Sequence, residues 1–207
     1  MMSAQPDIQD DPVAAARGIA ASKTFAPRGT VRCLGIPLFR TQIARDLGCL
    51  LDFDTDVVSW TCLPTALGEG GAAHVPDFLV ERGSGTTIED AVDGQTGGPE
   101  SWIVEAAHRA GHCYSATHST QMNAGYRLQN ARDLLRYARW HCPLGDRVRL
   151  LAALDEVGSM TVTECLAAFK ETAPIAGFAS LVLHRFIEVE LDEARIGPET
   201  AARRWRD

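Results

Sequence analysis

The chain has 207 residues, of which 45% are hydrophobic and 23% are charged, and its formal net charge is −7. This composition is typical of a globular protein with one large or two small domains. The sequence contains no run of eighteen apolar residues, so it predicts no membrane span. The negative net charge argues against indiscriminate binding of nucleic acid.

The charged residues are unevenly distributed along the chain. Residues 1–100 carry 7 basic and 14 acidic side chains, whereas residues 101–207 carry 13 of each, so the excess negative charge lies in the first half. Lys23 and Lys170 are the only lysines, and all other basic residues are arginines. Arginine is suited to phosphate groups because its planar guanidinium donates two parallel hydrogen bonds.

Residues 1–24 are polar, rich in alanine and acidic, and we expect them to form a poorly ordered tail. The segment lacks the basic and apolar regions of a secretory signal, which favours a cytoplasmic, nucleoid-associated protein. The six cysteines show no CxxC spacing, so we expect them to be reduced.

Residues 25–142 predict an α/β domain. Apolar residues at Ile43, Leu47 and Leu51 recur with helical spacing and indicate a helix over residues 40–52. The alternation of strand and helix patterns after it favours a mixed sheet flanked by helices. The remaining elements are expected to be strands over 57–63, 74–81, 88–92 and 112–116, and helices over 102–110 and 128–141.

Residues 143–207 predict three helices followed by a hairpin, which is the outline of a small winged helix-turn-helix domain. The third helix, over residues 174–185, is then the recognition helix. It would present Ser180, His184 and Arg185 to the DNA major groove. The alternative is a helical domain that only packs against its neighbour or contacts another protein.

A second candidate DNA surface is the expected helix over residues 128–141. Arg132, Arg136 and Arg139 fall at positions i, i+4 and i+7 and would share one face. The alternative is a solvated face whose arginines pair with acidic side chains. The further arginines assigned to phosphate contacts are Arg127, Arg147, Arg149, Arg203 and Arg204.

Carboxylates near the start of a strand indicate a possible metal-dependent nuclease site. Such sites bind Mg²⁺ through carboxylate oxygens, and a nearby lysine stabilises the charge that develops on phosphate. Asp77 directly precedes the apolar run FLV, which places it at a strand start. Glu89 and Asp90 follow in the next expected strand.

The runs ARDLGCLLDFDTDVVSW, CLP and HVPDFLVER together resemble the N-terminal domain of the TnsA-like transposon endonucleases, which are members of the PD-(D/E)xK nuclease superfamily. The segment after Pro143 is similar to the C-terminal half of the same architecture. The resemblance implies a restriction-endonuclease-like mixed sheet followed by a winged-helix domain. It also implies a Mg²⁺-dependent endonuclease that works with a transposase.

The chain departs from that family at its catalytic positions. Ala44 stands where the family has a metal-binding Glu, and no lysine occurs between Lys23 and Lys170. The segment expected to hold Glu-x-Lys reads IEDAVD. We therefore expect Asp77 to be a remnant, the nuclease-like domain to be inactive, and no cofactor to be bound.

A group of histidines and cysteines offers a possible zinc site. His108 and His112 are spaced i, i+4, with Cys113 and His118 close in sequence. No tight cysteine pair supports this site, so we favour ordinary, partly buried side chains and expect no metal.

These observations favour a regulatory or architectural protein that binds double-stranded DNA on a catalytically degenerate endonuclease fold. Two alternatives stay open. One is a Mg²⁺-dependent endonuclease subunit that uses Asp77 with Glu89 or Asp90 and is completed by a transposase-like partner. The other is an adaptor whose basic helix binds an acidic regulatory protein. A homodimer would match two-fold symmetric DNA sites.

Overall fold

The computed structural model describes residues 11–94 and 98–206. The first ten residues of the expected tail, residues 95–97 and residue 207 lie outside this part. The chain divides into two units, which are described separately. The first unit comprises Met1–Phe25, Cys33–Arg45 and Thr55–Ser119, and the second comprises Ala26–Arg32, Asp46–Asp54 and Thr120–Asp207.

The main division falls after Ser119 and not near residue 142, where the sequence pattern changes. The reason is that helix α5 (Arg127–Leu135) packs against helix α8 (Pro174–Leu183) and so belongs with the C-terminal part of the chain. Helix α2 (Gln42–Phe53) contributes to both units, because its residues up to Arg45 belong to the first and the rest to the second.

Helix α1 (Pro12–Ala21) lies in the segment that we expected to be poorly ordered, so this part of the prediction is wrong. Asp11 caps the helix, since its Oδ1 atom accepts a hydrogen bond from the Val13 amide at 2.9 Å. The proline occupies the first turn, where its missing N–H costs nothing. The many alanines of the segment favour a helix, because alanine has the highest helix propensity. Ala16 and Ala20 are buried.

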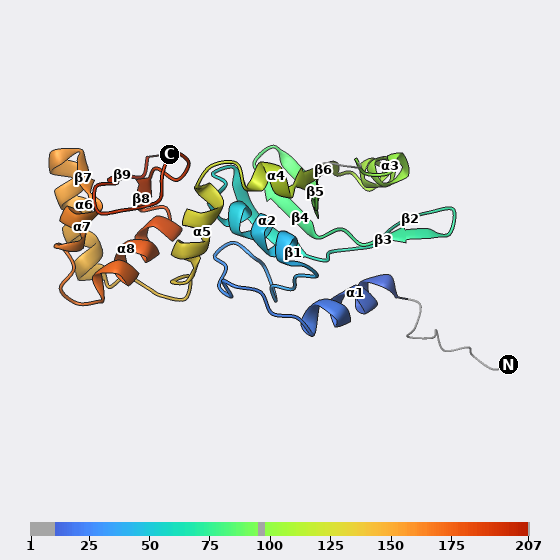
Figure 1. Cartoon of the computed structure of the whole chain (residues 1–207), viewed down its shortest axis with the longest axis horizontal. Coiled ribbons are helices and arrows are strands. Elements are labelled where there is room, and N and C mark those ends of the chain that lie inside the picture. Colours follow the sequence, from blue (N-terminus) through green and yellow to red (C-terminus); the bar gives the residue numbers. More distant parts are fainter. Residues whose placement is uncertain (1–10, 95–97, 207) are drawn as a thin grey trace. The chain divides into compact units, whose positions relative to one another are not determined.

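A four-stranded mixed sheet is the centre of the first unit (Figure 1). Its strand order is β1-β4-β5-β6, with antiparallel pairing up to β5 and parallel pairing between β5 and β6. Helix α3 (Ser101–Arg109) connects the two parallel strands. The strands are β1 (Val57–Cys62), β4 (Phe78–Arg82), β5 (Gly85–Val92) and β6 (Cys113–His118), and a small hairpin pairs β2 (Leu67–Glu69) with β3 (Ala72–His74). The expected α/β class with a mixed sheet is confirmed.

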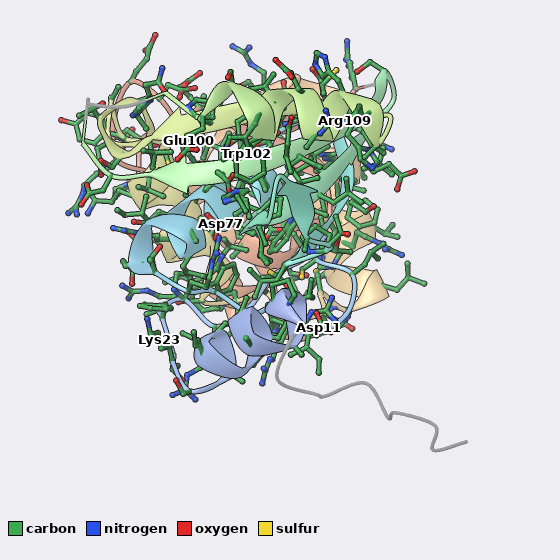
Figure 2. The ribbon with its side chains drawn as sticks, turned by 90° about the vertical axis from the view of Figure 1, so that its right-hand side faces the viewer. Asp11, Lys23, Asp77, Glu100, Trp102 and Arg109 are labelled. Carbon is green, nitrogen blue, oxygen red and sulfur yellow. The ribbon has the colours of Figure 1, made fainter. Side chains whose placement is uncertain are left out.

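Each face of this sheet carries part of the core. On one face the rings of Trp60 and Phe78 meet edge to face, with centroids 5.4 Å apart. On the other face Ile88 packs with Ile103 and Ala107 of α3. Figure 2 shows α3, which carries the labelled Trp102 and Arg109, lying across this second face. Both faces are therefore fixed by apolar packing, which sets the position of the polar residues at the strand ends.

The second unit has the element order α5, α6, β7, α7, α8, β8, β9 after the short helix α4 (Ser119–Met122). Its three strands form an antiparallel sheet of order β7-β9-β8. The bounds are α6 (Leu144–Val157), β7 (Ser159–Thr161), α7 (Val162–Leu166), β8 (Ile187–Val189) and β9 (Ala201–Arg204). Three helices and a closing hairpin agree with the expected outline, to which the structure adds β7.

Among the described residues, the structure contains no helix with both the length and the apolar character needed to cross a lipid bilayer.

Candidate functional site

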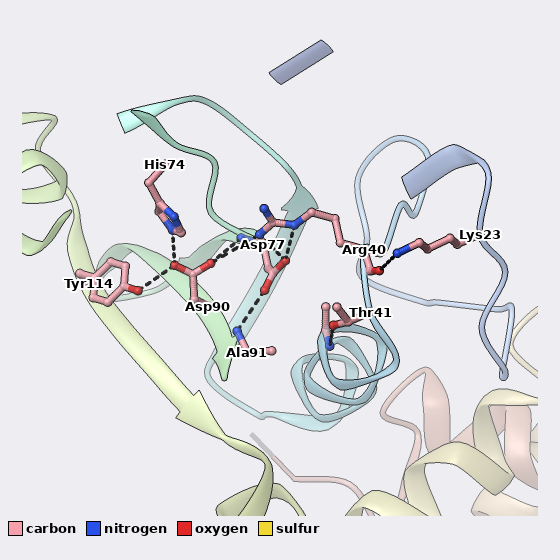
Figure 3. Close-up of polar contacts among 9 residues, drawn as sticks. Lys23, Arg40, Thr41, His74, Asp77, Asp90, Ala91 and Tyr114 are labelled. Atoms are coloured by element: carbon pink, nitrogen blue, oxygen red, sulfur yellow. Dashed lines mark hydrogen bonds and ion pairs between the residues drawn. The ribbon is translucent and has the colours of Figure 1, made fainter. Parts of the chain in front are cut away.

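Two buried aspartates of the first unit lie side by side at one end of the sheet (Figure 3). Asp77 directly precedes β4 and Asp90 lies in β5, and the antiparallel register that pairs Phe78 with Glu89 brings them together. The Asp77 amide donates to Oδ1 of Asp90 at 2.9 Å. In return, Oδ2 of Asp77 accepts from the Ala91 amide at 3.1 Å. The pairing of strands therefore builds a carboxylate pair, which we call the Asp77–Asp90 site.

The Arg40 guanidinium lies against both carboxylates (Figure 3). Its Nη2 and Nε atoms donate to Oδ1 of Asp77 at 2.7 and 3.1 Å, and Nη2 lies 3.9 Å from Oδ1 of Asp90. The carbonyl of Arg40 accepts a hydrogen bond from Nζ of Lys23 at 2.8 Å, which holds the backbone from which the side chain starts. A cationic side chain of the same unit thus compensates the buried negative charge.

Two further side chains bind Asp90 on the side away from Asp77. Oδ2 of Asp90 lies 2.6 Å from Nε2 of His74 and accepts from the Tyr114 hydroxyl at 2.7 Å. His74 ends β3, and Tyr114 lies in β6, the strand parallel to β5. All four oxygens of the carboxylate pair are therefore engaged by protein groups.

The surroundings shift the pKa values of the two aspartates in opposite directions. Burial raises the pKa of Asp77 above its ordinary value, although Arg40 acts to lower it. Burial also acts to raise the pKa of Asp90, but His74, Tyr114 and the Asp77 amide outweigh it, so that pKa lies below its ordinary value. Burial and the Asp90 charge raise the pKa of Tyr114, which keeps its hydroxyl a hydrogen-bond donor.

Glu89 does not join the carboxylate pair. Neighbouring residues of a strand point to opposite faces, so Glu89 faces away from Asp90. Its Oε1 atom pairs with Nη1 of Arg82 at 2.7 Å. Of the two alternatives that the sequence left open as a companion to Asp77, the structure places Asp90 there.

Another position named from the sequence, Ala44, is closed to solvent. Ala44 is buried in α2, and its amide bonds to the Thr41 hydroxyl at 3.1 Å. In β5, the residue two positions after Asp90 is Val92 and not a lysine. Within the described ranges, no group of three or more His, Cys, Asp or Glu side chains is arranged to hold a metal ion.

The histidines and cysteine near α3 are engaged separately. Nδ1 of His112 lies 2.6 Å from the Thr86 hydroxyl, and Nδ1 of His118 lies 2.9 Å from the carbonyl of Gly94. His108 and Cys113 are exposed. The helical spacing of His108 and His112 is also lost, because α3 ends at Arg109.

The arginines of the expected helix over 128–141 do not share one face, because α5 ends at Leu135 and Arg136 and Arg139 lie beyond it. Arg132 pairs with Asp46 of α2 at 2.5 Å. Arg136 makes a 3.2 Å contact with Asp133, but 72% of its side chain is exposed. Arg139 is exposed and forms no hydrogen bond or ion pair with any described residue.

Most of the other arginines named from the sequence are engaged within the second unit. Arg127 pairs with Asp192 at 2.8 Å, and Arg149 pairs with Asp146 at 2.5 Å. The guanidinium of Arg147 stacks on the Phe186 ring, 4.6 Å from its centroid. Arg204 pairs with Asp155. Arg203, in β9, is exposed.

Helix α8 cannot present its side chains to the bases of DNA in this structure. Its residues from Ala176 to Leu183 are all buried, because the sequence PIAGFASLVL is apolar on every side. Ser180 is 3% exposed and accepts a hydrogen bond from the Cys142 amide at 3.2 Å. The expected exposure of Ser180 is therefore wrong.

The two residues after α8 differ from each other. His184 is exposed and keeps its Nδ1 atom 2.8 Å from the Ser180 carbonyl. Arg185 donates from Nη2 to the Asp54 carbonyl at 2.7 Å and packs over the Trp205 ring. Arg185 thus stabilises the second unit.

Comparison with known proteins gives no family: no family model matches the chain, and no curated protein matches it significantly.

Proposed function

We propose that the chain is a DNA-binding protein, regulatory or architectural, built on a catalytically degenerate endonuclease fold. The observation that carries the proposal is the position of Arg40 between Asp77 and Asp90. In PD-(D/E)xK nucleases the strand-start Asp and its neighbour on the next strand bind a divalent cation. Here a guanidinium lies against both, so the charge that a metal would supply comes from the protein.

The element order of the first unit supports this proposal. Apart from the β2–β3 hairpin, a helix, three antiparallel strands, a second helix and a strand parallel to the third run in the order α2, β1, β4, β5, α3, β6. The TnsA-like resemblance leads us to expect a mixed sheet flanked by helices, and this order is compatible with that expectation. The lysine and the helical Glu of that family contribute electrostatic stabilisation and metal binding, and their loss removes much of the rate.

The second unit supports binding through phosphate contacts. Its order α6, β7, α7, α8, β8, β9 agrees with a winged-helix domain, but α8 is buried and offers no base contacts. Arg136, Arg139 and Arg203 are exposed. Phosphate contacts position a protein on DNA without reading its sequence, so the proposed binding tolerates many sequences.

The test is a gel-shift measurement on labelled duplex DNA at low and moderate salt, with and without Mg²⁺, on a gel that also resolves cleavage. We expect a retarded, intact duplex whose affinity falls steeply with salt, because each phosphate contact adds about 0.9 to the slope of log K against log [salt]. A salt-independent affinity, or no retardation at any salt concentration, would refute DNA binding.

The second candidate is the Mg²⁺-dependent endonuclease subunit, and the shared face of Asp77 and Asp90 favours it. A partner such as a transposase would then supply the missing groups. Its signature is shortened DNA that appears only with Mg²⁺ and disappears in Asp77→Ala. Glu156→Ala, which removes an exposed carboxylate of α6, is the matched control.

A further inference from the structure

Among the residues that the structure describes, three arginines and no acidic residue line a hollow of about 320 Å³ in the second unit. Arg28 comes from the segment before α2, whereas Arg136 and Arg139 follow α5. Pro27, Gly29 and Leu135 complete the lining. Residues more than a hundred positions apart in the chain are thus brought together around one hollow.

Close packing of two backbone segments brings these arginines together. A Cβ atom added to Gly29 would lie 2.6 Å from Cβ of Ala138 and 3.1 Å from the carbonyl oxygen of Leu135. Only a residue without a side chain permits this approach. The absence of a Cβ at Gly29 therefore allows Arg28 to stand beside the arginines that follow α5.

The guanidinium groups of the hollow are largely uncompensated. Arg28 and Arg139 are exposed, and neither forms a hydrogen bond or ion pair within residues 11–94 and 98–206. Within the described ranges, the guanidinium of Arg136 pairs with Asp133 alone, in a contact at 3.2 Å between two exposed side chains. Like charges held close together repel one another, and an anion between them relieves that repulsion.

We infer that Arg28, Arg136 and Arg139 form a binding site for a phosphate group, here named the arginine hollow. Three guanidinium groups offer forked donors to phosphate oxygens. The inference rests on the proposed function in one respect, which is that the phosphate belongs to the DNA backbone. Free nucleotides also carry a phosphate group, and the experiments below distinguish them from the DNA backbone as the ligand.

The experiment compares duplex binding by wild type, Arg28→Gln and Arg109→Gln over a range of salt concentrations. Arg109 is an exposed arginine of α3 outside the hollow, so its variant changes net charge equally. We expect Arg28→Gln to lower the slope of log K against log [salt] by about 0.9 and to weaken binding roughly fivefold at about 0.15 M salt. Arg109→Gln is expected to leave the slope unchanged. Equal effects of both variants would overturn the inference, because only net charge would then matter.

A second measurement keeps the arginine hollow testable if wild type does not bind duplex DNA. Thermal unfolding is followed with inorganic phosphate, dAMP or chloride at constant ionic strength. A rise in Tm with phosphate or dAMP that is lost in Arg28→Gln supports the site, since a ligand of the native state stabilises it. In that case the site binds the phosphate of a free nucleotide, so the proposed DNA binding is refuted while the arginine hollow is retained. If phosphate has no more effect than chloride and Arg28→Gln binds duplex as wild type does, the site does not exist.

Discussion

The Nη2 atom of Arg40 lies 2.7 Å from Oδ1 of Asp77, and the same guanidinium is 3.9 Å from Asp90. Both aspartates are buried, while the arginine side chain is 29% exposed. The contact joins two structural elements, since Arg40 precedes α2 and Asp77 directly precedes β4. The contact therefore links the segment before α2 to the start of β4 and compensates a buried negative charge.

Arg40→Met is expected to destabilise the protein. The substitution keeps most of the side-chain volume but leaves the buried Asp77 carboxylate without its cation, which costs about 1–3 kcal/mol. Urea unfolding monitored by circular dichroism measures the loss. Arg109→Met is the control, because the Arg109–Glu69 pair is exposed and worth less than about 1 kcal/mol. Equal losses of unfolding free energy in the two variants would show that the Arg40–Asp77 contact stabilises the protein no more than an exposed ion pair does.

Removal of Arg40 is also expected to create a Mg²⁺ site. Arg40→Ala opens the space between two carboxylates that face the same point, and carboxylate oxygens are ligands that Mg²⁺ accepts. Mg²⁺ at ten times its Kd would then stabilise the variant by about 1.4 kcal/mol. Thermal unfolding with and without Mg²⁺ detects this effect.

The controls for this prediction are wild type and Arg40→Ala combined with Asp77→Asn. Neither is expected to respond to Mg²⁺, because one keeps the guanidinium and the other lacks a ligand. A response of the double variant as large as that of Arg40→Ala would place the cation elsewhere.

The stability of the first unit is expected to depend on pH through Asp90. Its pKa is lower in the folded protein than its ordinary value, so its charged form stabilises the fold above the unfolded-state pKa of about 3.9. That contribution is lost as the pH falls through the folded-state pKa. The difference in unfolding free energy between wild type and Asp90→Asn should thus be largest above about pH 4 and shrink in acid.

Asp77 acts with the opposite sign, because its pKa is raised in the folded protein. Its contribution opposes folding increasingly as the pH rises from the unfolded-state pKa to the folded-state pKa, and it is absent well below the unfolded-state pKa. Urea unfolding at several pH values between about 3 and 7 separates the two aspartates, with the exposed Asp133→Asn as control. A wild-type minus Asp90→Asn difference that grows in acid would contradict the assignment.

The sequence predicted helices α2 and α3 and the four strands of the sheet, but not α1 or the β2–β3 hairpin, because the signals of the predicted elements are local. The β-branched and aromatic run of β1 and the apolar spacing of α2 are sufficient for each element. The sequence also predicted Asp77 at a strand start and named Asp90 as one of two candidate companions. The partners Arg40, His74 and Tyr114 were missed, because strand pairing and loop position bring them to the site.

Two errors in the second unit have physical causes of different kinds. The burial of α8 could have been predicted, because a helix that is apolar on all sides has no surface to expose. The end of α5 at Leu135 could not, because RYAR continues the helical pattern. Arg28 carried no signal, since its role depends on the close packing of Gly29 against Ala138.

Gly29→Ala is expected to destabilise the second unit and weaken DNA binding together. The added methyl group would lie 2.6 Å from Cβ of Ala138, and neither atom can rotate away, so the backbone has to shift. Overpacking of this kind costs about 1–3 kcal/mol. The shift moves Arg28 away from Arg136 and Arg139, and duplex affinity should fall about as much as in Arg28→Gln. Urea unfolding and gel-shift titration of the same preparation measure both effects.

Gly18→Ala is the matched control for this substitution. Gly18 lies inside α1 and nothing stands within 4 Å of its added Cβ atom, so the change should stabilise the helix by roughly 0.5–1 kcal/mol. It should leave DNA affinity unchanged, because α1 is outside the arginine hollow. If Gly29→Ala is as stable as wild type and binds DNA equally well, the close approach of the two segments does not position Arg28, and the hollow would lose its structural basis.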